Sequence, residues 1–155
     1  MVTDEHDVVE RIAPEGGVVV GDDGSEGAGK AIVFGVEEAR RRGTTLHVLR
    51  AWTITSAVRP RGAATGYVPS LREFERGTLE AEQRRVDELC GQDVGVPVEA
   101  HVVHSASAQA LIEASKTCDL VVLGSRGRGG FASLVLGSVA LQCVAHAHCP
   151  VTVVR

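Results

Sequence analysis

Two glycine-rich segments mark the places where this chain could bind an anion. The sequence holds 18 glycines, many of them gathered in residues 16–29 and 124–137. A glycine lets a backbone N–H group approach a ligand closely because no Cβ stands in the way. In each segment, glycines follow directly after a valine-rich run. Both are therefore candidate phosphate-binding loops.

The second segment has the residue types that a phosphate site needs. It follows the pattern G-x2-G-x9-G-S, whose fixed positions are Gly124, Gly127, Gly137 and Ser138. The final glycine and serine precede an expected helix, where N–H groups and the helix dipole favour phosphate. Arg126 and Arg128 add positive charge at the same place. We predict that this segment holds phosphates; the alternative is that its glycines merely turn the chain.

The first segment resembles a Walker-type phosphate loop only in part. Residues 24–30 read GSEGAGK, but Ala31 stands where a Ser or Thr would contact Mg²⁺. Three acids, Asp22, Asp23 and Glu26, would also repel a phosphate. We interpret this segment as a strand-to-helix turn with Ser25 as the helix N-cap. A small nucleotide-dependent kinase or transferase that uses Gly24–Lys30 is the alternative.

Short apolar runs alternate with amphipathic segments along the whole chain. We expect strands over 17–21, 44–51, 96–103, 119–124 and 150–154, and helices over 28–42, 69–90, 107–117 and 138–146. Such alternation predicts a single α/β domain with a parallel sheet between two helix layers. Ligands bind such sheets beyond the carboxyl ends of the strands, where both glycine segments begin. The stretch 53–67 predicts a long loop, either a basic lid or an ordinary solvated loop. Residues 1–15 predict a flexible leader and residues 16–155 the domain.

Composition excludes several classes of protein. The formal net charge is −4, which disfavours a nucleic-acid-binding or membrane-surface module. No apolar run is long enough for a membrane span. The four cysteines form no CxxC motif, which indicates free thiols in a cytoplasmic protein. His101 with His104, and His146 with His148 and Cys149, lack a second ligand pair of matching spacing, so the sequence does not favour a metal site there. No nucleophile elbow of the G-x-S-x-G type is present.

The phosphate motif resembles that of the universal stress protein family, in its ATP-binding branch. Residues 18–25 (VVVGDDGS), 47–52 (HVLRAW) and 145–154 (AHAHCPVTVV) also resemble that family, and the resemblance spans about residues 17–155. It implies a Rossmann-like, doubly wound sheet of five parallel strands in the order 3-2-1-4-5. It further implies a stress-response module that binds ATP, AMP or ADP, with slow hydrolysis at most and no catalytic residue. A homodimer formed through Pro150–Val154 is implied as well.

The resemblance also implies which residues line the nucleotide site. They are Gly21, Asp22, Asp23, Val48, Ala51, Val103, Gly124, Arg126, Gly127, Gly137, Ser138 and Val139. Asp23 matches the acid near the ribose or a nucleotide-bound Mg²⁺. Asp22 departs from the family pattern and adds a second carboxylate, which either helps to hold Mg²⁺ or weakens anion binding. A member of the family that has lost nucleotide binding and acts only as an interaction dimer is the remaining alternative.

Overall fold

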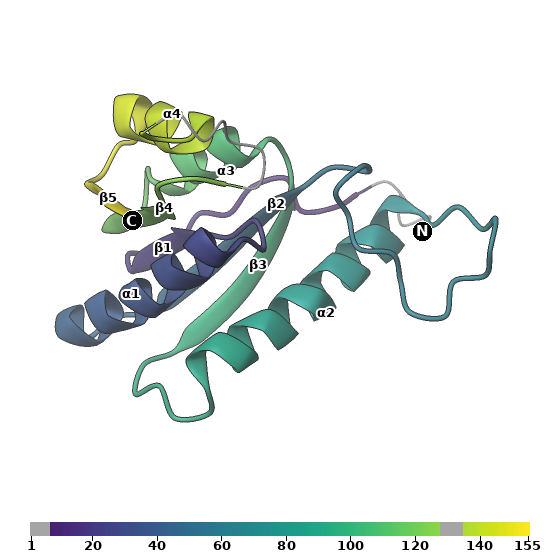
Figure 1. Cartoon of the computed structure of the whole chain (residues 1–155), viewed down its shortest axis with the longest axis horizontal. Helices are drawn as coiled ribbons and strands as arrows, with labels where there is room; N and C mark the ends of the chain where they lie inside the picture. Colours follow the sequence, from purple (N-terminus) through teal and green to yellow (C-terminus); the bar gives the residue numbers. More distant parts are fainter. Residues whose placement is uncertain (1–6, 128–134) are drawn as a thin grey trace.

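Five parallel strands form one sheet that lies between two layers of helices (Figure 1). The computed structural model describes residues 7–127 and 135–155. The strands are β1 (Val18–Gly21), β2 (Leu46–Trp52), β3 (Val98–His104), β4 (Leu120–Gly124) and β5 (Val151–Val154). The helices are α1 (Glu26–Arg42), α2 (Leu71–Cys90), α3 (Ser107–Ala114) and α4 (Ser138–His146). The strand order β3-β2-β1-β4-β5 confirms the predicted α/β fold class.

Side chains alternate between the two faces of the sheet, and each face has its own apolar core. Val18 and Val20 of β1 pack with α1, whereas Val19 packs with α3 and α4. The same alternation places Val48 of β2 on the α1 face and Leu49 on the other. Because successive side chains of a strand point to opposite faces, burial on both sides explains the continuous valine runs.

The four helices begin in two different ways. Ser25 accepts a hydrogen bond from Ala28 N (3.1 Å) and caps α1, as predicted. Ser70 and Glu73 form a capping box at the start of α2. Within the described residues, no side chain caps the first turn of α3 or of α4. The N–H groups at these two helix starts are therefore available for another acceptor.

Element boundaries differ from the prediction by a few residues. Helix α1 begins at Glu26 instead of residue 28, because the Ser25 cap lets the helix start directly and include Gly27 and Gly29. Helix α3 ends at Ala114 instead of residue 117. In the described parts of the chain, no helix is long and apolar enough to cross a membrane.

Part of the predicted leader contacts the domain. Of residues 1–15, the structure describes 7–15. Val8 is buried against Trp52 and Phe74. The backbone of Val9 accepts a hydrogen bond from His104 N (2.8 Å) and donates one to Glu75 Oε1 (2.7 Å). This segment therefore adds to the core at the carboxyl end of β3.

The loop between β2 and α2 packs against α2. Val58 N donates to Thr78 Oγ1 (3.0 Å), and Arg59 donates to the Tyr67 carbonyl (2.7 Å) within the loop. Gly77 allows this approach, because a Cβ there would lie 2.6 Å from the Val58 carbonyl oxygen. In Figure 1 the loop extends from the end of the molecule where α2 begins.

Candidate functional site: a cavity at the carboxyl ends of the strands

A cavity of about 420 Å³ opens at the carboxyl ends of β1, β2 and β4. Its walls come from the turn after β1, the loop after β4 and the starts of α3 and α4. Its volume falls within the usual range for small-molecule sites. The lining residues are Gly21, Asp22, Asp23, Ala28, Leu49, Ala51, Ser107, Ala110, Leu111, Leu123, Gly124, Arg126, Gly127, Gly137, Ser138, Val139 and Ala140.

One end of the cavity presents backbone N–H groups. Ser138, Val139 and Ala140 form the first turn of α4, and all three line the cavity. The N–H groups of a first helical turn have no partner within the helix, and they carry the positive end of its dipole. Ser107, the first residue of α3, lines the cavity as well. Arg126 adds a cationic side chain to the wall. This end of the cavity is suited to an anion.

Close packing explains two glycines of the second segment in different ways. A Cβ at Gly124 would lie 2.9 Å from the backbone of Gly27, so the end of β4 approaches the first turn of α1 only because this position is glycine. A Cβ at Gly127 would lie 2.6 Å from Asp23 Oδ2, so a side chain there would displace the Asp23 carboxylate. A Cβ at Gly137, by contrast, would meet its neighbours at 3.5 Å or more.

The two carboxylates after β1 lie in different surroundings. The Asp22 side chain is fully buried and accepts hydrogen bonds from Arg85 Nε (2.6 Å) and Nη2 (3.1 Å). Its charge is therefore neutralised by α2. Asp23 Oδ1 accepts a hydrogen bond from Ser25 N (2.9 Å), while Oδ2 lies close to Gly127 in the cavity wall. Asp23 is thus the carboxylate placed to meet a ligand.

Behind Asp22, two more charged side chains lie between α2 and the sheet. Glu82 is fully buried, and its Oε2 lies 3.3 Å from Arg50 Nη1. Burial and the nearby Asp22 charge raise the pKa of Glu82, Arg50 opposes both effects, and the resulting pKa is about 8. Glu82 is therefore largely a neutral acid at pH 7.

The structure gathers most of the predicted site residues around this cavity. Of the residues implied by the resemblance, all except Val48 and Val103 line it. Val48 packs in the core on the α1 face, and Val103 is fully buried in the core under α3. Leu49 lines the cavity instead. The alternation of side chains along β2 predicts this difference, because Leu49 and Ala51 point to one face of the sheet and Val48 points to the other.

Some other residues that line the cavity could not be predicted from the glycine pattern. Leu123 is the residue before the last one of β4, and Ser107, Ala110 and Leu111 come from α3. Only the crossover of α3 over the sheet brings its three residues to the site. Arg128, predicted to add charge to this loop, lies outside the described residues.

The first glycine segment does not form a phosphate loop. Gly27, Gly29 and Lys30 are within α1, and Lys30 Nζ lies 3.9 Å from Glu26 Oε1. Lys30 is not among the cavity-lining residues. The interpretation of this segment as a strand-to-helix turn agrees with this arrangement.

Comparison with known proteins places the fold in one family. The model of the universal stress protein family matches residues 17–155. Universal stress protein Rv1996 of Mycobacterium tuberculosis is 39% identical over 148 residues, which cover 92% of this chain and 44% of that protein. The chain thus spans about half the length of the curated relatives it matches.

Solved structures share the fold at lower identity. The universal stress protein UspA from Lactobacillus plantarum superposes with a TM-score of 0.70 at 21% identity, covering 93% of this chain and all of that one. A universal stress protein in complex with cAMP gives 0.66 at 24% identity, covering 90% and 97%. A family member from Arabidopsis thaliana with AMP bound gives 0.58 at 21% identity, covering 90% of both chains.

Proposed function

Because the chain belongs to the universal stress protein family, we propose that it is a regulatory module that binds ATP or a related adenine nucleotide in the cavity described above. Structural neighbours have been solved with cAMP and with AMP. Their identity to this chain is too low to transfer a ligand. The proposal therefore depends on the chemistry of the cavity itself.

The start of α4 carries the proposal. Its first-turn N–H groups lie in the cavity wall, and no side chain of the described residues caps them; the glycines Gly124 and Gly127 line the same wall. In helices α1 and α2, by contrast, a serine cap accepts a hydrogen bond from a first-turn N–H group. A phosphate group would satisfy the α4 N–H groups and interact with the dipole, with Arg126 adding charge.

The other end of the cavity fits a base. Leu49, Ala51 and Leu111 present apolar surface between the sheet and α3. Asp23 also lines the cavity, with Oδ2 near Gly127, where it would accept hydrogen bonds from a ribose or bind a nucleotide-bound Mg²⁺. Carboxylate and phosphate oxygens together are ligands that Mg²⁺ prefers.

We propose regulation with slow hydrolysis at most, and not efficient phosphoryl transfer. Among the described cavity-lining residues there is no lysine or histidine to orient a transferred phosphoryl group or activate water. Asp22 is bound by Arg85, which leaves Asp23 as the carboxylate facing the ligand.

The test is to identify and then measure the ligand. Native mass spectrometry of gently purified protein should show a bound adenine nucleotide, and ATP with Mg²⁺ should raise the thermal midpoint of unfolding. At about 100 times its Kd, a ligand stabilises the folded state by roughly 2.7 kcal/mol, which such a scan detects. Protein that arrives empty and shows no shift with ATP and Mg²⁺ would overturn the proposal.

Two variants separate this site from the first glycine segment. Gly127→Asp should abolish the shift, because it adds bulk and negative charge beside Asp23. Lys30→Ala should leave the shift unchanged, since Lys30 lies outside the cavity wall. The opposite result would favour a nucleotide-dependent kinase or transferase that uses Gly24–Lys30.

We also propose that the chain pairs with a second copy through β5. This strand is at the edge of the sheet and is bonded to β4 on one side. An edge strand offers unpaired N–H and C=O groups to another strand. Light scattering coupled to size-exclusion chromatography should give the mass of a dimer, and Val153→Pro should shift it to a monomer by removing an N–H that faces away from β4.

A further inference from the structure

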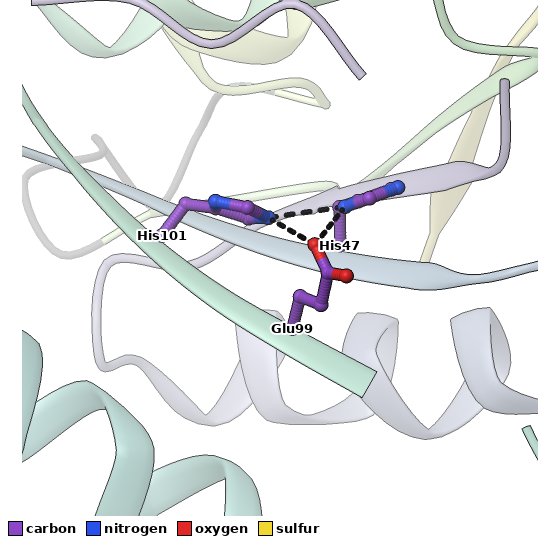
Figure 2. Close-up of side chains that lie close together, drawn as sticks. All are labelled: His47, Glu99 and His101. Carbon is purple, nitrogen blue, oxygen red and sulfur yellow. Dashed lines mark hydrogen bonds and ion pairs between the residues drawn. The ribbon is translucent and has the colours of Figure 1, made fainter. Parts of the chain in front are cut away.

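A cluster of two histidines and one glutamate lies outside the nucleotide cavity. His47 of β2 pairs in register with Glu99 of β3, and His101 is two residues further along β3 on the same face. None of the three lines the cavity. In Figure 2 the Glu99 carboxylate points up between the two imidazole rings, and dashed lines join the three side chains in a triangle.

The three ligand-type atoms converge on one small volume. His47 Nδ1 and His101 Nε2 are 3.0 Å apart, and Glu99 Oε2 lies 3.4 Å from each of them. A tetrahedral Zn²⁺ with its ligands at about 2.0–2.1 Å holds them about 3.3 Å from one another. The observed triangle therefore has the dimensions of one face of a zinc coordination tetrahedron.

We propose that His47, Glu99 and His101 bind a transition-metal ion of the Zn²⁺ class, with water or another small ligand at the remaining position. Two imidazole nitrogens and one carboxylate oxygen are a donor set that suits this ion. Three protein ligands leave a coordination position open. The nucleotide proposal is separate, since the metal site uses a different part of the sheet.

A metal ion would use all three facing atoms at once. Glu99 Oε2 carries lone pairs, and each neutral imidazole presents a lone pair or an N–H according to its tautomer, so one N–H bridges a single pair whereas a cation at the centre would bridge all three atoms. Burial lowers the pKa of both histidines below 6.5, and this effect outweighs the opposing influence of Glu99. Neutral imidazoles are the form that binds metals.

The backbone also holds the cluster in place. His47 is buried, and its ring packs against Gly17, where a Cβ would lie 3.1 Å from Cδ2 and Nε2. The Glu99 side chain is 55% exposed and His101 is 25% exposed. An ion can therefore enter from solvent on the Glu99 side and meet a preformed histidine pair.

The experiment measures metal binding by the whole chain after treatment with a chelator and without nucleotide. Zn²⁺ should bind with one equivalent in competition with a chromophoric chelator. Co²⁺ in its place should give the visible absorption of a tetrahedral site with nitrogen and oxygen ligands. His101→Ala should lower the Zn²⁺ affinity at least tenfold. Mutating residues that only hydrogen-bond to metal ligands already lowers affinity by about 10- to 100-fold, and losing a ligand should cost no less.

Matched variants keep the test decisive. His104→Ala changes a histidine of the same strand that packs on Trp52, and it should leave the affinity unchanged. Cys149→Ser removes the partly buried thiol that lies 3.7 Å from Cys118 Sγ, the other place where Zn²⁺ could bind. Circular dichroism of each metal-free variant checks that it is folded.

Three results would overturn the proposal. They are the absence of stoichiometric binding by the unmodified chain, an affinity that His101→Ala leaves intact, and an equal loss in Cys149→Ser. Sulfur-to-cobalt charge-transfer absorption would likewise assign the ion to the thiols.

Discussion

The two sides of the sheet differ at the carboxyl end of β1. On the α2 side, the buried Asp22 is paired with Arg85, and Arg50 lies 3.3 Å from the buried Glu82. On the α3 and α4 side, Asp23, the glycines after β4 and the start of α4 surround a cavity. Asp22 and Asp23 are adjacent in one turn, yet Asp22 belongs to a closed charge network with Arg85, and Asp23 belongs to the open cavity.

This difference teaches where polar groups serve stability and where they serve binding. Asp22 already has Arg85 as its cation, so its charge is not directed at a ligand. The start of α4 and Asp23 line a volume that residues 7–127 and 135–155 leave open. Changes on the α2 side should therefore alter the free energy of unfolding, and changes on the other side should alter ligand affinity.

The largest effect is expected from Arg85→Met. This change leaves the buried Asp22 carboxylate without its cation, and breaking a buried pair in this way costs about 3 kcal/mol or more. Urea denaturation should show that loss. The double variant Asp22→Asn/Arg85→Met should recover part of it, because the stranded charge is gone. A loss below about 1 kcal/mol, as for an exposed ion pair, would contradict the closed network.

The second prediction concerns the pH dependence of stability through Glu82. Above pH 4.5 the unfolded chain loses the Glu82 proton, whereas the folded chain keeps it until about pH 8. The free energy of unfolding should therefore fall as the pH rises through this window, by up to about 1.4 kcal/mol per pH unit. In Glu82→Gln, the free energy of unfolding should depend on pH less steeply by that amount. Denaturation curves of both proteins at several pH values measure the two slopes. Identical slopes would mean that Glu82 is ionised in the folded protein.

The third prediction compares one glycine from each glycine-rich segment. Gly127→Ala should weaken nucleotide binding about tenfold, or about 1.4 kcal/mol, because its Cβ displaces Asp23. A Cβ at Gly29, within α1, would lie 3.5 Å or more from its neighbours. Gly29→Ala should therefore leave the nucleotide affinity unchanged, and it should raise the stability slightly because alanine has the higher helix propensity. Titration calorimetry with ATP and Mg²⁺ measures both. A loss in Gly29→Ala alone would move the phosphate site to the first segment.

The smallest effect is expected from two helix-start serines. Ser25→Ala removes the cap of α1 and should cost about 1 kcal/mol of stability with little change in affinity. Ser138→Ala removes a hydroxyl from the cavity wall, where no side-chain cap is lost, and should reduce affinity while stability stays within about 0.5 kcal/mol. If both variants changed only stability, the start of α4 would not be a binding element.

Much of the fold was predictable because its signals are local. Valine runs indicated strands buried on both faces, and the α4 bounds were predicted residue for residue. The side chain of Val48 packs on the α1 face and not in the cavity wall, as strand alternation relative to Ala51 indicates. Ser107 and Leu111 were missed because nothing near them in the chain indicates a cavity. The pairing of His101 with His47, and not with His104, depends on the register of β2 and β3.

By itself, the sequence determined the family, the alternation of strands and helices, and the glycine positions around the cavity, because residue type and spacing carry these directly. Only the tertiary structure decided that Asp22 faces Arg85 while Asp23 faces Gly127, and that His47 meets Glu99 and His101. The physical reason is distance along the chain. Arg85 is 63 residues from Asp22 and His101 is 54 from His47, so only helix packing and strand register bring these groups into contact.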